Sequence, residues 1–340
     1  MLDSLVASAL IPDPFIRIGI RRLLSQRLEE ISKGSEVELK KYKEEFIKNC
    51  KSSPIAVQTR DANEQHYEVP TEFYLYALGP HLKYSCAYFE EGDDLGKAEE
   101  RMFEKTVATA KIKDGDKILE LGCGWGSLTL YMGRQFPNSK ITAVSNSRTQ
   151  KEFILKKAEK LGLKNIQIIT ADMNQFQTEE KFDRVVSVEM FEHMRNHQLL
   201  LEKVASWLNP KGTLFVHIFV HRDTPYLFEV KDDSDWMSKY FFSGGMMPSD
   251  DYFTYYQDHF QLVDHVKYNG IHYSKTAEAW LENMDKNKDK VREIFENHYG
   301  KKEATKWIEY WRIFFMSCSE LWKFKNGEEW FVSHYLMEKK

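Results

Sequence analysis

Three side chains near the middle of the chain are of the types that move protons. Glu189, Glu192 and His193 lie in the run EMFEH at 189–193, which begins on the last residue of the expected strand RVVSVE at 184–189. Two carboxylates and an imidazole at the end of a buried strand are typical of a general acid/base site. Taken singly, the histidine could pack in the core and the acids could cap the next helix. The combination E-x-x-E-H favours the acid/base interpretation.

Three alternating glycines indicate a site for a nucleotide-like ligand. The run KILELGCGWG at 117–126 leads from an apolar strand into Gly122, Gly124 and Gly126, with Glu120 just before them. Glycine lets the backbone turn sharply and approach a ligand with no Cβ atom in the way. A dinucleotide fingerprint would need its third glycine at Ser127, and a phosphate-binding loop would need a Gly-Lys-Ser/Thr ending. What remains is the loop of enzymes that bind S-adenosylmethionine (SAM), where the glycines pass under the methionine part and the acid lies near its amino group.

Polar residues after the next two expected strands extend this cofactor site. Ligands of open α/β sheets bind beyond the carboxyl ends of the strands, so residues that follow successive strands should lie near one another. Ser145, Asn146 and Gln150 follow the strand KITAVS and offer neutral hydrogen-bonding groups to a ribose. Asp172 and Met173 follow the strand IQIITA and suit the amine and the ring of adenine. Each could instead be an ordinary cap or turn residue.

The order of the expected elements predicts an α/β fold that brings these residues together. Strands alternate with helices from the glycine loop onward, which is the pattern of a parallel sheet. We expect strands at 117–121, 140–145, 166–171, 184–189, 212–220, about 260–268 and 330–337. We expect helices at 35–51, 94–111, 126–135, 147–161, 197–207 and 275–322. Three segments follow from this pattern: a helical annex and lid at 1–93, a SAM-binding core at 94–220, and substrate-binding insertions with the closing strands at 221–340.

Composition narrows the class of protein. The 340 residues carry a net charge of −4, which argues against a nucleic-acid surface. No run of about 18 apolar residues predicts a membrane span, and residues 1–12 resemble the start of a helix more than a signal peptide. The four cysteines are far apart and form no C-x-x-C pair, so neither a disulfide framework nor a metal site is expected. These features predict a cytoplasmic protein, and they are compatible with a homodimer.

Several motifs resemble a known family. The stretches YSCAYF at 84–89, ELGCGWG at 120–126, VSVEMFEHM at 186–194 and VHIF at 216–219 resemble the cyclopropane fatty acid synthase family of SAM-dependent methyltransferases. Four more stretches resemble its branch of coclaurine-type and pavine-type N-methyltransferases; they are DDSDWMSKYFFSGGMMPS at 232–249, FTYYQD at 253–258, YWRIFF at 310–315 and NGEEWFVSH at 326–334. The resemblance implies a class I SAM-methyltransferase fold, Rossmann-like, with a mixed seven-stranded sheet and helical substrate-binding insertions.

The resemblance also implies roles for individual residues. Tyr84 and Ser85 would touch the methionine part of SAM and complete the cofactor site that the strand ends predict. Glu192 and His193 would orient an amine and accept its proton, and Glu189 would support the site or hold the ammonium form. S-adenosylhomocysteine (SAH) would be the product.

A second reaction of the same family uses a different base. The cyclopropane synthases methylate carbon in lipid alkenes and hold a bicarbonate ion as base. The matching positions here would be Cys86, Glu192, His217, Phe219 (through its backbone) and Tyr273. Tyr273 keeps the synthase residue, whereas Glu189 follows the N-methyltransferases at a position where the synthases generally have glycine. A carboxylate beside the cage would repel an anion and attract an ammonium group.

The insertion at 221–259 supplies further clues to the substrate. Its aromatic residues include Trp236 and Phe241, which could form a stacking or cation–π wall, although ordinary core packing explains them equally well. The acidic residues Glu90, Glu91, Asp93, Asp94, Asp232, Asp233 and Asp235 suit a cationic amine better than an anionic lipid surface. We therefore expect an N-methyltransferase of a small aromatic, arylalkyl or alkaloid-like amine, with carbon methylation of lipid alkenes as the alternative.

Overall fold

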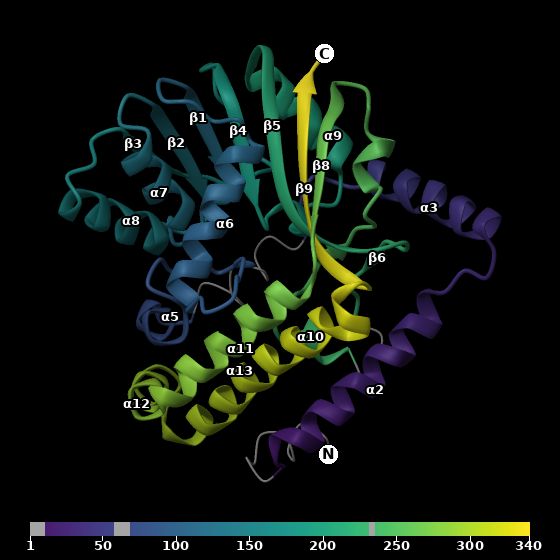
Figure 1. Ribbon diagram of the computed structural model, residues 1–340, viewed down its shortest axis with the longest axis vertical. Coiled ribbons are helices and arrows are strands. Elements are labelled where there is room, and N and C mark those ends of the chain that lie inside the picture. The colour runs from purple at the N-terminus through teal and green to yellow at the C-terminus, as the bar shows by residue number, and fades with distance from the viewer. Residues whose placement is uncertain (1–10, 58–68, 231–234) are drawn as a thin grey trace.

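Seven strands form one mixed sheet in the computed structural model, which describes residues 11–57, 69–230 and 235–340 (Figure 1). The sheet has the order β3-β2-β1-β4-β5-β9-β8. Its strands are β1 (Lys117–Leu121), β2 (Lys140–Ser145), β3 (Ile166–Thr170), β4 (Phe182–Val188), β5 (Leu208–His221), β8 (Phe260–Tyr268) and β9 (Trp330–Lys339). The first five are parallel, and β9 runs antiparallel to both β5 and β8. The predicted mixed seven-stranded sheet is confirmed.

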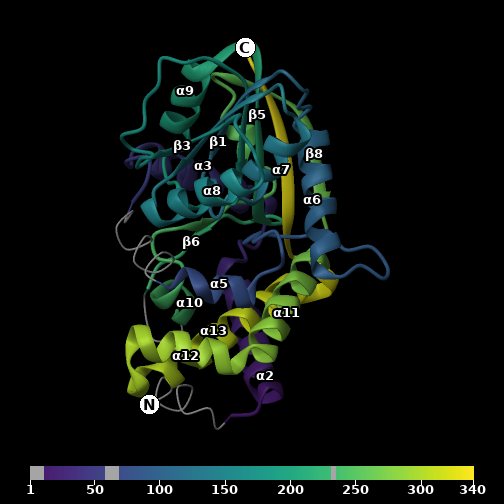
Figure 2. The ribbon, with the colours of Figure 1, turned by 90° about the vertical axis from the view of Figure 1, so that its left-hand side faces the viewer.

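Helices cover both faces of this sheet. They are α6 (Leu95–Thr109), α7 (Ser127–Gln135), α8 (Arg148–Lys160) and α9 (His197–Trp207), with α3 (Glu36–Lys51) packed on α9. Local signals set where they begin: Ser35 and Glu38 form a capping box on α3, and the Ser147 hydroxyl accepts a bond from the Gln150 amide at the start of α8. Figure 2, turned by 90°, shows α6 and α7 on one side of the strands and α9 on the other.

A second, helical layer lies beyond the carboxyl ends of the parallel strands (Figures 1 and 2). It consists of α2 (Asp13–Ile31), α5 (Thr71–Ala77), α11 (Ile271–Lys286), α12 (Lys288–Tyr299) and α13 (Lys301–Trp322). The predicted helical span 275–322 is instead three helices, because the backbone leaves the helical conformation twice. The cap of α11 is Asn287, with φ −102° and ψ 19°, and the cap of α12 is Gly300, with φ +81° and ψ 155°. The fully buried Trp280 and Trp311 hold this layer together.

The insertion at 221–259 packs against both layers: Tyr252 and Phe253 join the core beside the sheet, and Phe241 joins the core of the helical layer. It contains a two-stranded ribbon of β6 (Tyr226–Leu227) and β7 (Met246–Met247), the short helix α10 (Trp236–Tyr240) and the 3-10 turn η2 (Tyr252–Tyr255). Because β8 and β9 complete the same sheet as β1 to β5, the predicted boundary at residue 220 divides the chain but not the sheet. The three-segment division stays a prediction.

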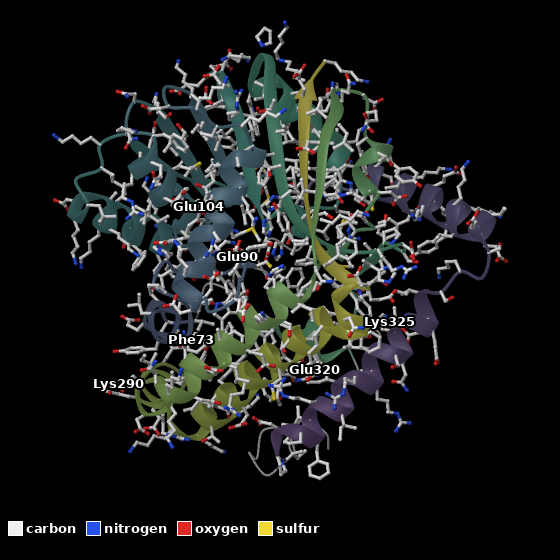
Figure 3. All side chains as sticks on the ribbon, viewed as in Figure 1. Phe73, Glu90, Glu104, Lys290, Glu320 and Lys325 are labelled. Carbon is white, nitrogen blue, oxygen red and sulfur yellow. The ribbon has the colours of Figure 1, made fainter. Side chains whose placement is uncertain are left out.

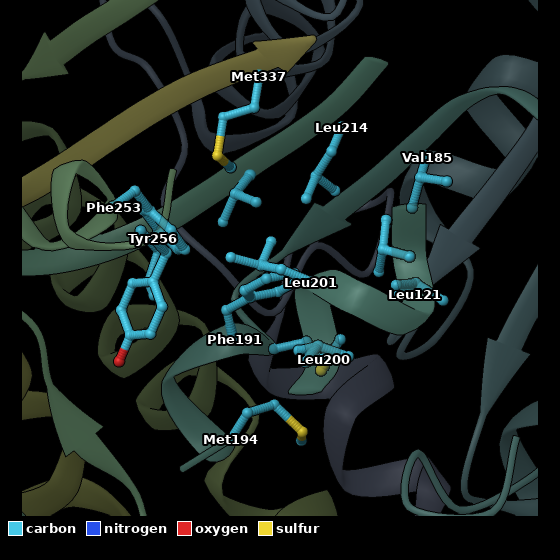
Figure 4. Close-up of a cluster of buried hydrophobic side chains, with 14 of the residues drawn as sticks. Leu121, Val185, Phe191, Met194, Leu200, Leu201, Leu214, Phe253, Tyr256 and Met337 are labelled. Carbon is cyan, nitrogen blue, oxygen red and sulfur yellow. The ribbon is translucent and has the colours of Figure 1, made fainter. Parts of the chain in front are cut away.

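One hydrophobic cluster fixes the centre of the sheet to α9 (Figure 4). It joins Leu121 at the end of β1, Val185 of β4 and Leu214 of β5 to Leu200 and Leu201 of α9, and all five side chains are buried. The cluster therefore anchors the carboxyl ends of β1 and β4, where both predicted motifs stand.

Candidate active site

The glycine loop between β1 and α7 shapes the floor of a cavity. Gly122, Gly124 and Gly126 all have positive φ, of +78°, +51° and +77°. A Cβ atom at Gly122 would lie 2.6 Å from the Met190 side chain, and one at Gly126 would lie 2.6 Å from Ile154. At Gly124 a Cβ would meet no described atom within 4 Å. Two of the glycines are thus required by packing, whereas Gly124 faces the open side where a cofactor would pass.

The cavity has a volume of about 560 Å³ and lies between the sheet edge and the helical layer. Five of the predicted cofactor residues line it, namely Tyr84, Ser85, Gly122, Gly124 and Gln150. So do the three predicted acid/base residues, Glu189, Glu192 and His193. The arrangement fits SAM, because an open glycine cradle and a buried acidic centre share one chamber. SAM when bound would rest on the loop, with Glu120 on the same wall.

The remaining predicted cofactor residues follow β2 and β3 outside the lining of this cavity. The Ser145 hydroxyl donates to Gln150 Oε1 at 2.7 Å and so orients that side chain. Asn146 is exposed, and Met173 is buried. Asp172 accepts a bond from the Asn174 amide at 2.7 Å, which forms a local turn. Their contacts with the ribose and adenine stay a prediction.

Glu189 is enclosed by hydrogen-bond donors from three separate parts of the chain. Its Oε1 accepts from the Cys86 amide at 2.9 Å and lies 3.1 Å from His217 Nε2, and its Oε2 accepts from the Tyr273 hydroxyl at 2.5 Å. Burial raises the pKa of Glu189 to about 7, while the Lys83 ammonium and the donors from Tyr273 and Cys86 oppose that rise. The residue also has φ +47°, a left-handed backbone that is costly for a side chain other than glycine.

A second histidine stands behind this centre. His334 on β9 lies opposite His217 on β5, and its Nε2 lies 2.8 Å from His217 Nδ1. When Glu189 is a carboxylate it can only accept, so His217 donates from Nε2 and receives a bond at Nδ1 from His334. Burial lowers the pKa of both histidines well below its ordinary value, which keeps both rings neutral. The pair therefore fixes the His217 tautomer. Sequence reasoning missed His334, which no spacing links to His217.

Glu192 is fully buried, more so than Glu189, but lacks such donors. Neither carboxylate oxygen has a hydrogen-bond partner among residues 11–57, 69–230 and 235–340, although the side chain lines the cavity. Burial and repulsion from Glu189 raise the pKa of Glu192 well above its ordinary value. An acid that is buried, unbonded and easily protonated has the properties of a proton acceptor.

The turn that carries Glu192 and His193 is held in place by hydrogen bonds of His197. It is the 3-10 helix η1 (Phe191–His193). His197, which sequence reasoning also missed, contacts the Phe191 carbonyl through Nε2 at 2.8 Å and the Tyr252 hydroxyl through Nδ1 at 3.0 Å. Burial lowers the pKa of His197 to about 4, so this brace is uncharged at neutral pH. The His193 ring stacks on Phe242 with centroids 4.5 Å apart.

Aromatic side chains form the wall that faces the acid/base residues. Phe219, Trp236 and Tyr273 line the cavity as predicted positions, and the Tyr273 ring stacks on Trp322 at 4.7 Å. Phe241 is not among the lining residues: its ring is buried, stacks on Phe314 at 4.5 Å and packs in the helical layer, as the core-packing alternative expects. Its contact with a substrate stays a prediction. Its neighbour lines the cavity instead; that residue is Phe242. These adjacent residues at the end of α10 point to opposite sides, and composition alone does not reveal which of them faces the cavity.

Cys86 and His217 reach the site only through Glu189. Neither belongs to the cavity lining. The Cys86 thiol, whose pKa burial raises well above its ordinary value, points to the Ala87 carbonyl at 3.2 Å, so its backbone amide makes the contact with Glu189.

The predicted acidic residues divide between two places. Asp235 lines the cavity and pairs with Arg27 of α2 at 2.7 Å. The loop at 90–94 lies elsewhere, where Asp93 pairs with Arg101 at 2.7 Å and Asp94 caps α6. Asp232 and Asp233 lie outside the described residues.

Helix α2 closes the cavity on the side away from the sheet. Its apolar residues Ile16, Ile20 and Leu24 line the chamber. Arg17 binds Glu278 of α11 at 2.6 and 2.8 Å and Glu320 of α13 at 3.1 Å. Glu320 is labelled in Figure 3, on α13 where this helix lies beside α2. These ion pairs hold the helix across α11 and α13.

Comparison with known proteins identifies the family to which this chain belongs. The mycolic acid cyclopropane synthetase family matches residues 56–328. The chain belongs to this family. It is 39% identical over 336 residues to (S)-coclaurine N-methyltransferase of Thalictrum flavum subsp. glaucum, which covers 97% of this chain and 93% of the relative. Like this relative, the protein is a SAM-dependent methyltransferase.

Solved structures give the same result. The crystal structure of coclaurine N-methyltransferase bound to N-methylheliamine and SAH superposes with a TM-score of 0.97 at 36% identity and covers 99% of each chain. The cyclopropane synthase MmaA2 from Mycobacterium tuberculosis superposes with a TM-score of 0.70 at 20% identity, over 84% of this chain and 100% of that one; this likeness concerns the fold. Within the described part of the chain, no helix has both the length and the apolar character that crossing a membrane requires.

Proposed function

We propose that this methyltransferase acts on the nitrogen of a small aromatic, alkaloid-like amine. The observation that carries the proposal is the position of Glu189. Its carboxylate accepts hydrogen bonds from the Cys86 amide, His217 and Tyr273. These are three of the positions that an anion cage for bicarbonate would use. The protein would then supply its own anion at the position where the family resemblance places a bicarbonate ion.

The acid/base residues suit an amine acceptor. When bound, SAM supplies an electrophilic methyl group on a sulfonium sulfur, and SAH is the product. An ammonium group has no lone pair, so the amine must lose a proton before it attacks. Glu192 faces the cavity with both oxygens unbonded among the described residues, and it accepts that proton directly or through water, while His193 orients the nitrogen. The negative charge of Glu189 favours binding of the ammonium form.

The aromatic wall suits the body of such a substrate. The rings of Phe219, Phe228 and Phe242 line the cavity and contact one another with centroids 5.0 to 6.4 Å apart. An aryl group would stack against these rings, and an ammonium group would lie near their faces. The relative bound to N-methylheliamine supports this choice of substrate class.

Carbon methylation of a lipid alkene is the competing function. It would need a bicarbonate ion among the donors that already bond Glu189. Two anions at about 4 Å repel by several kcal/mol at an effective dielectric near 20. This cost argues against bicarbonate at the site.

The test offers a panel of arylalkylamines and phospholipid vesicles to the enzyme, in buffer with and without bicarbonate. We expect amines to gain the mass of a methyl group in both buffers, and lipids to remain unchanged. Glu189→Gly should lower amine methylation, and Tyr273→Phe should keep most of it. A strict requirement for bicarbonate would overturn the proposal. So would a result in which Tyr273→Phe loses its activity while Glu189→Gly retains full activity.

Two further expectations are separate from the chemistry. Assembly into a homodimer is tested by sedimentation velocity of the purified chain. A cytoplasmic location is tested by imaging a fluorescent fusion protein. Neither result would alter the assignment of the acceptor.

A further inference from the structure

One buried cation lines the cofactor side of the cavity and is not used by the chemistry above. Lys83 precedes Tyr84 and Ser85, and only 2% of its surface is exposed. In the part of the chain that the structure describes, its Nζ makes one hydrogen bond, to Ser85 Oγ, and no ion pair. Both residues line the cavity. An ammonium group has three N–H donors, so two of them remain for a ligand.

A buried ammonium needs an anion close by. Removing a charge from water costs several kcal/mol unless a partner of opposite sign replaces the lost hydration. Burial lowers the pKa of Lys83, and the acids that oppose this shift are Glu189, Cys86 and Glu99. Glu189 already accepts bonds from three donors, and Glu99 accepts from the backbone amides of His81 and Lys83. Neither carboxylate is within ion-pair distance of Lys83 Nζ.

An acid that lines the same chamber carries the complementary charge. Glu120 lines the cavity beside the glycine loop, and its Oε2 accepts a bond from the Thr129 hydroxyl at 2.5 Å. Lys83 and Glu120 thus present a cation and an acid to one space. The amino-acid end of SAM and SAH is a zwitterion, with an ammonium group and a carboxylate on the same carbon. Its amino group suits Glu120, and its carboxylate needs a cation.

We propose that Lys83 binds the carboxylate of the amino-acid part of SAM and SAH, together with the Ser85 hydroxyl. Ser85 accepts a bond from Lys83 through its oxygen and keeps its own proton to donate to the carboxylate. A charge-assisted bond of this kind is stronger than a neutral one. The inference concerns the cofactor, so it holds whether the acceptor is nitrogen or carbon.

The test measures binding in the absence of any acceptor substrate. Calorimetry gives the Kd of SAH and of its decarboxylated analogue, in which hydrogen replaces the carboxylate. We expect the unchanged enzyme to bind SAH at least about tenfold more tightly than the analogue. Lys83→Met keeps the length of the side chain and removes the charge. It should weaken SAH roughly 10- to 100-fold and leave the affinity for the analogue within about twofold.

Two further variants separate charge from structure. Lys83→Arg keeps the charge and should retain the preference for SAH over the analogue. Lys105→Met is the matched control, because the Lys105 ammonium lies 3.9 Å from the Tyr88 ring centroid and outside the cavity lining. It should change neither affinity.

Several outcomes would overturn the inference. One is equal weakening of both ligands in Lys83→Met, since Lys83 would then only shape the loop at 82–86. Another is unchanged SAH affinity in a folded Lys83→Met protein, since the lysine would then serve Glu189 alone. If Lys83→Met does not fold, the wild-type measurement still decides: equal affinity for SAH and the decarboxylated analogue would exclude a cation at the carboxylate.

Discussion

The two walls of the cavity are built on different principles. The cofactor wall comes from the carboxyl ends of β1 and β4 and depends on unusual backbone, with positive φ at Gly122, Gly124 and Glu189. The substrate wall comes from α2, α13 and the insertion between β5 and β8, and it depends on aromatic and apolar side chains on ordinary backbone. The cofactor wall therefore requires particular residues at particular positions, whereas the substrate wall requires only large apolar or aromatic side chains.

This difference predicts how each wall responds to substitution. On the cofactor wall each group makes a contact that no neighbour can replace, so its removal should cause a large loss of one property, either turnover or SAH binding. On the aromatic wall neighbouring rings share the contact area, so removal of one ring should be partial. The following experiments test that contrast.

The largest effect is expected at Glu192. Glu192→Gln removes the proton acceptor and should lower the turnover number about 10²- to 10⁴-fold, while SAH affinity changes little. Higher pH should restore part of the loss, because more of the amine is then already deprotonated. Steady-state kinetics from pH 7 to 10 measure both effects, with His193→Ala as the second variant. Near-normal turnover in both proteins would mean that the turn at 191–193 is merely structural.

The glycine loop offers a matched pair of variants. Gly124→Val should abolish SAH binding in a folded protein, because the new side chain would fill the open side of the loop. Gly122→Ala should instead destabilise the protein by about 1–3 kcal/mol, because its Cβ would lie 2.6 Å from Met190. Calorimetry and thermal unfolding separate the two effects. Unchanged SAH affinity in folded Gly124→Val would contradict the cofactor assignment.

Two phenylalanines test the aromatic wall. Phe228→Ala should raise the KM for the amine about 2- to 30-fold and leave SAM binding unchanged, because its ring faces the cavity. Phe241→Ala should leave the KM nearly constant but cost about 3–5 kcal/mol of stability, because that ring is buried against Phe314. If the two variants exchange these effects, the division between lining and packing residues is wrong.

The smallest effect concerns Glu120 in the ligand-free protein. Burial raises its pKa to about 7, above the value near 4.3 of an unfolded glutamate. Between these values the folded state binds the extra proton, so the stability that Glu120 contributes falls as pH rises. Glu120→Gln should therefore gain melting temperature relative to wild type between pH 5 and pH 7.5. A difference in Tm that does not change with pH would show that Glu120 is not protonated in the fold.

The same contrast explains what could be predicted from the sequence. The strand and loop at 117–126 carry their own signals, since apolar runs and glycines act locally. The three donors to Glu189 come from residues 86, 217 and 273, which no local pattern joins; only the family resemblance grouped them, as positions of a bicarbonate cage. Lys83 and His334 matter because of what surrounds them, and burial is visible only in the fold. Phe241 and Phe242 have the same composition signal, so only the turn after α10 distinguishes them.

The left-handed backbone of Glu189 has a consequence for the descent of these enzymes. At φ +47° a glutamate side chain is tolerated at a cost of about 1–2 kcal/mol, whereas glycine fits without strain. Exchange between the two residues therefore needs no rearrangement of the main chain. Glycine and glutamate codons differ by as little as one base. A single mutation is therefore enough to replace a glycine, which would leave room for a bicarbonate ion, by a glutamate whose carboxylate takes the place of that ion.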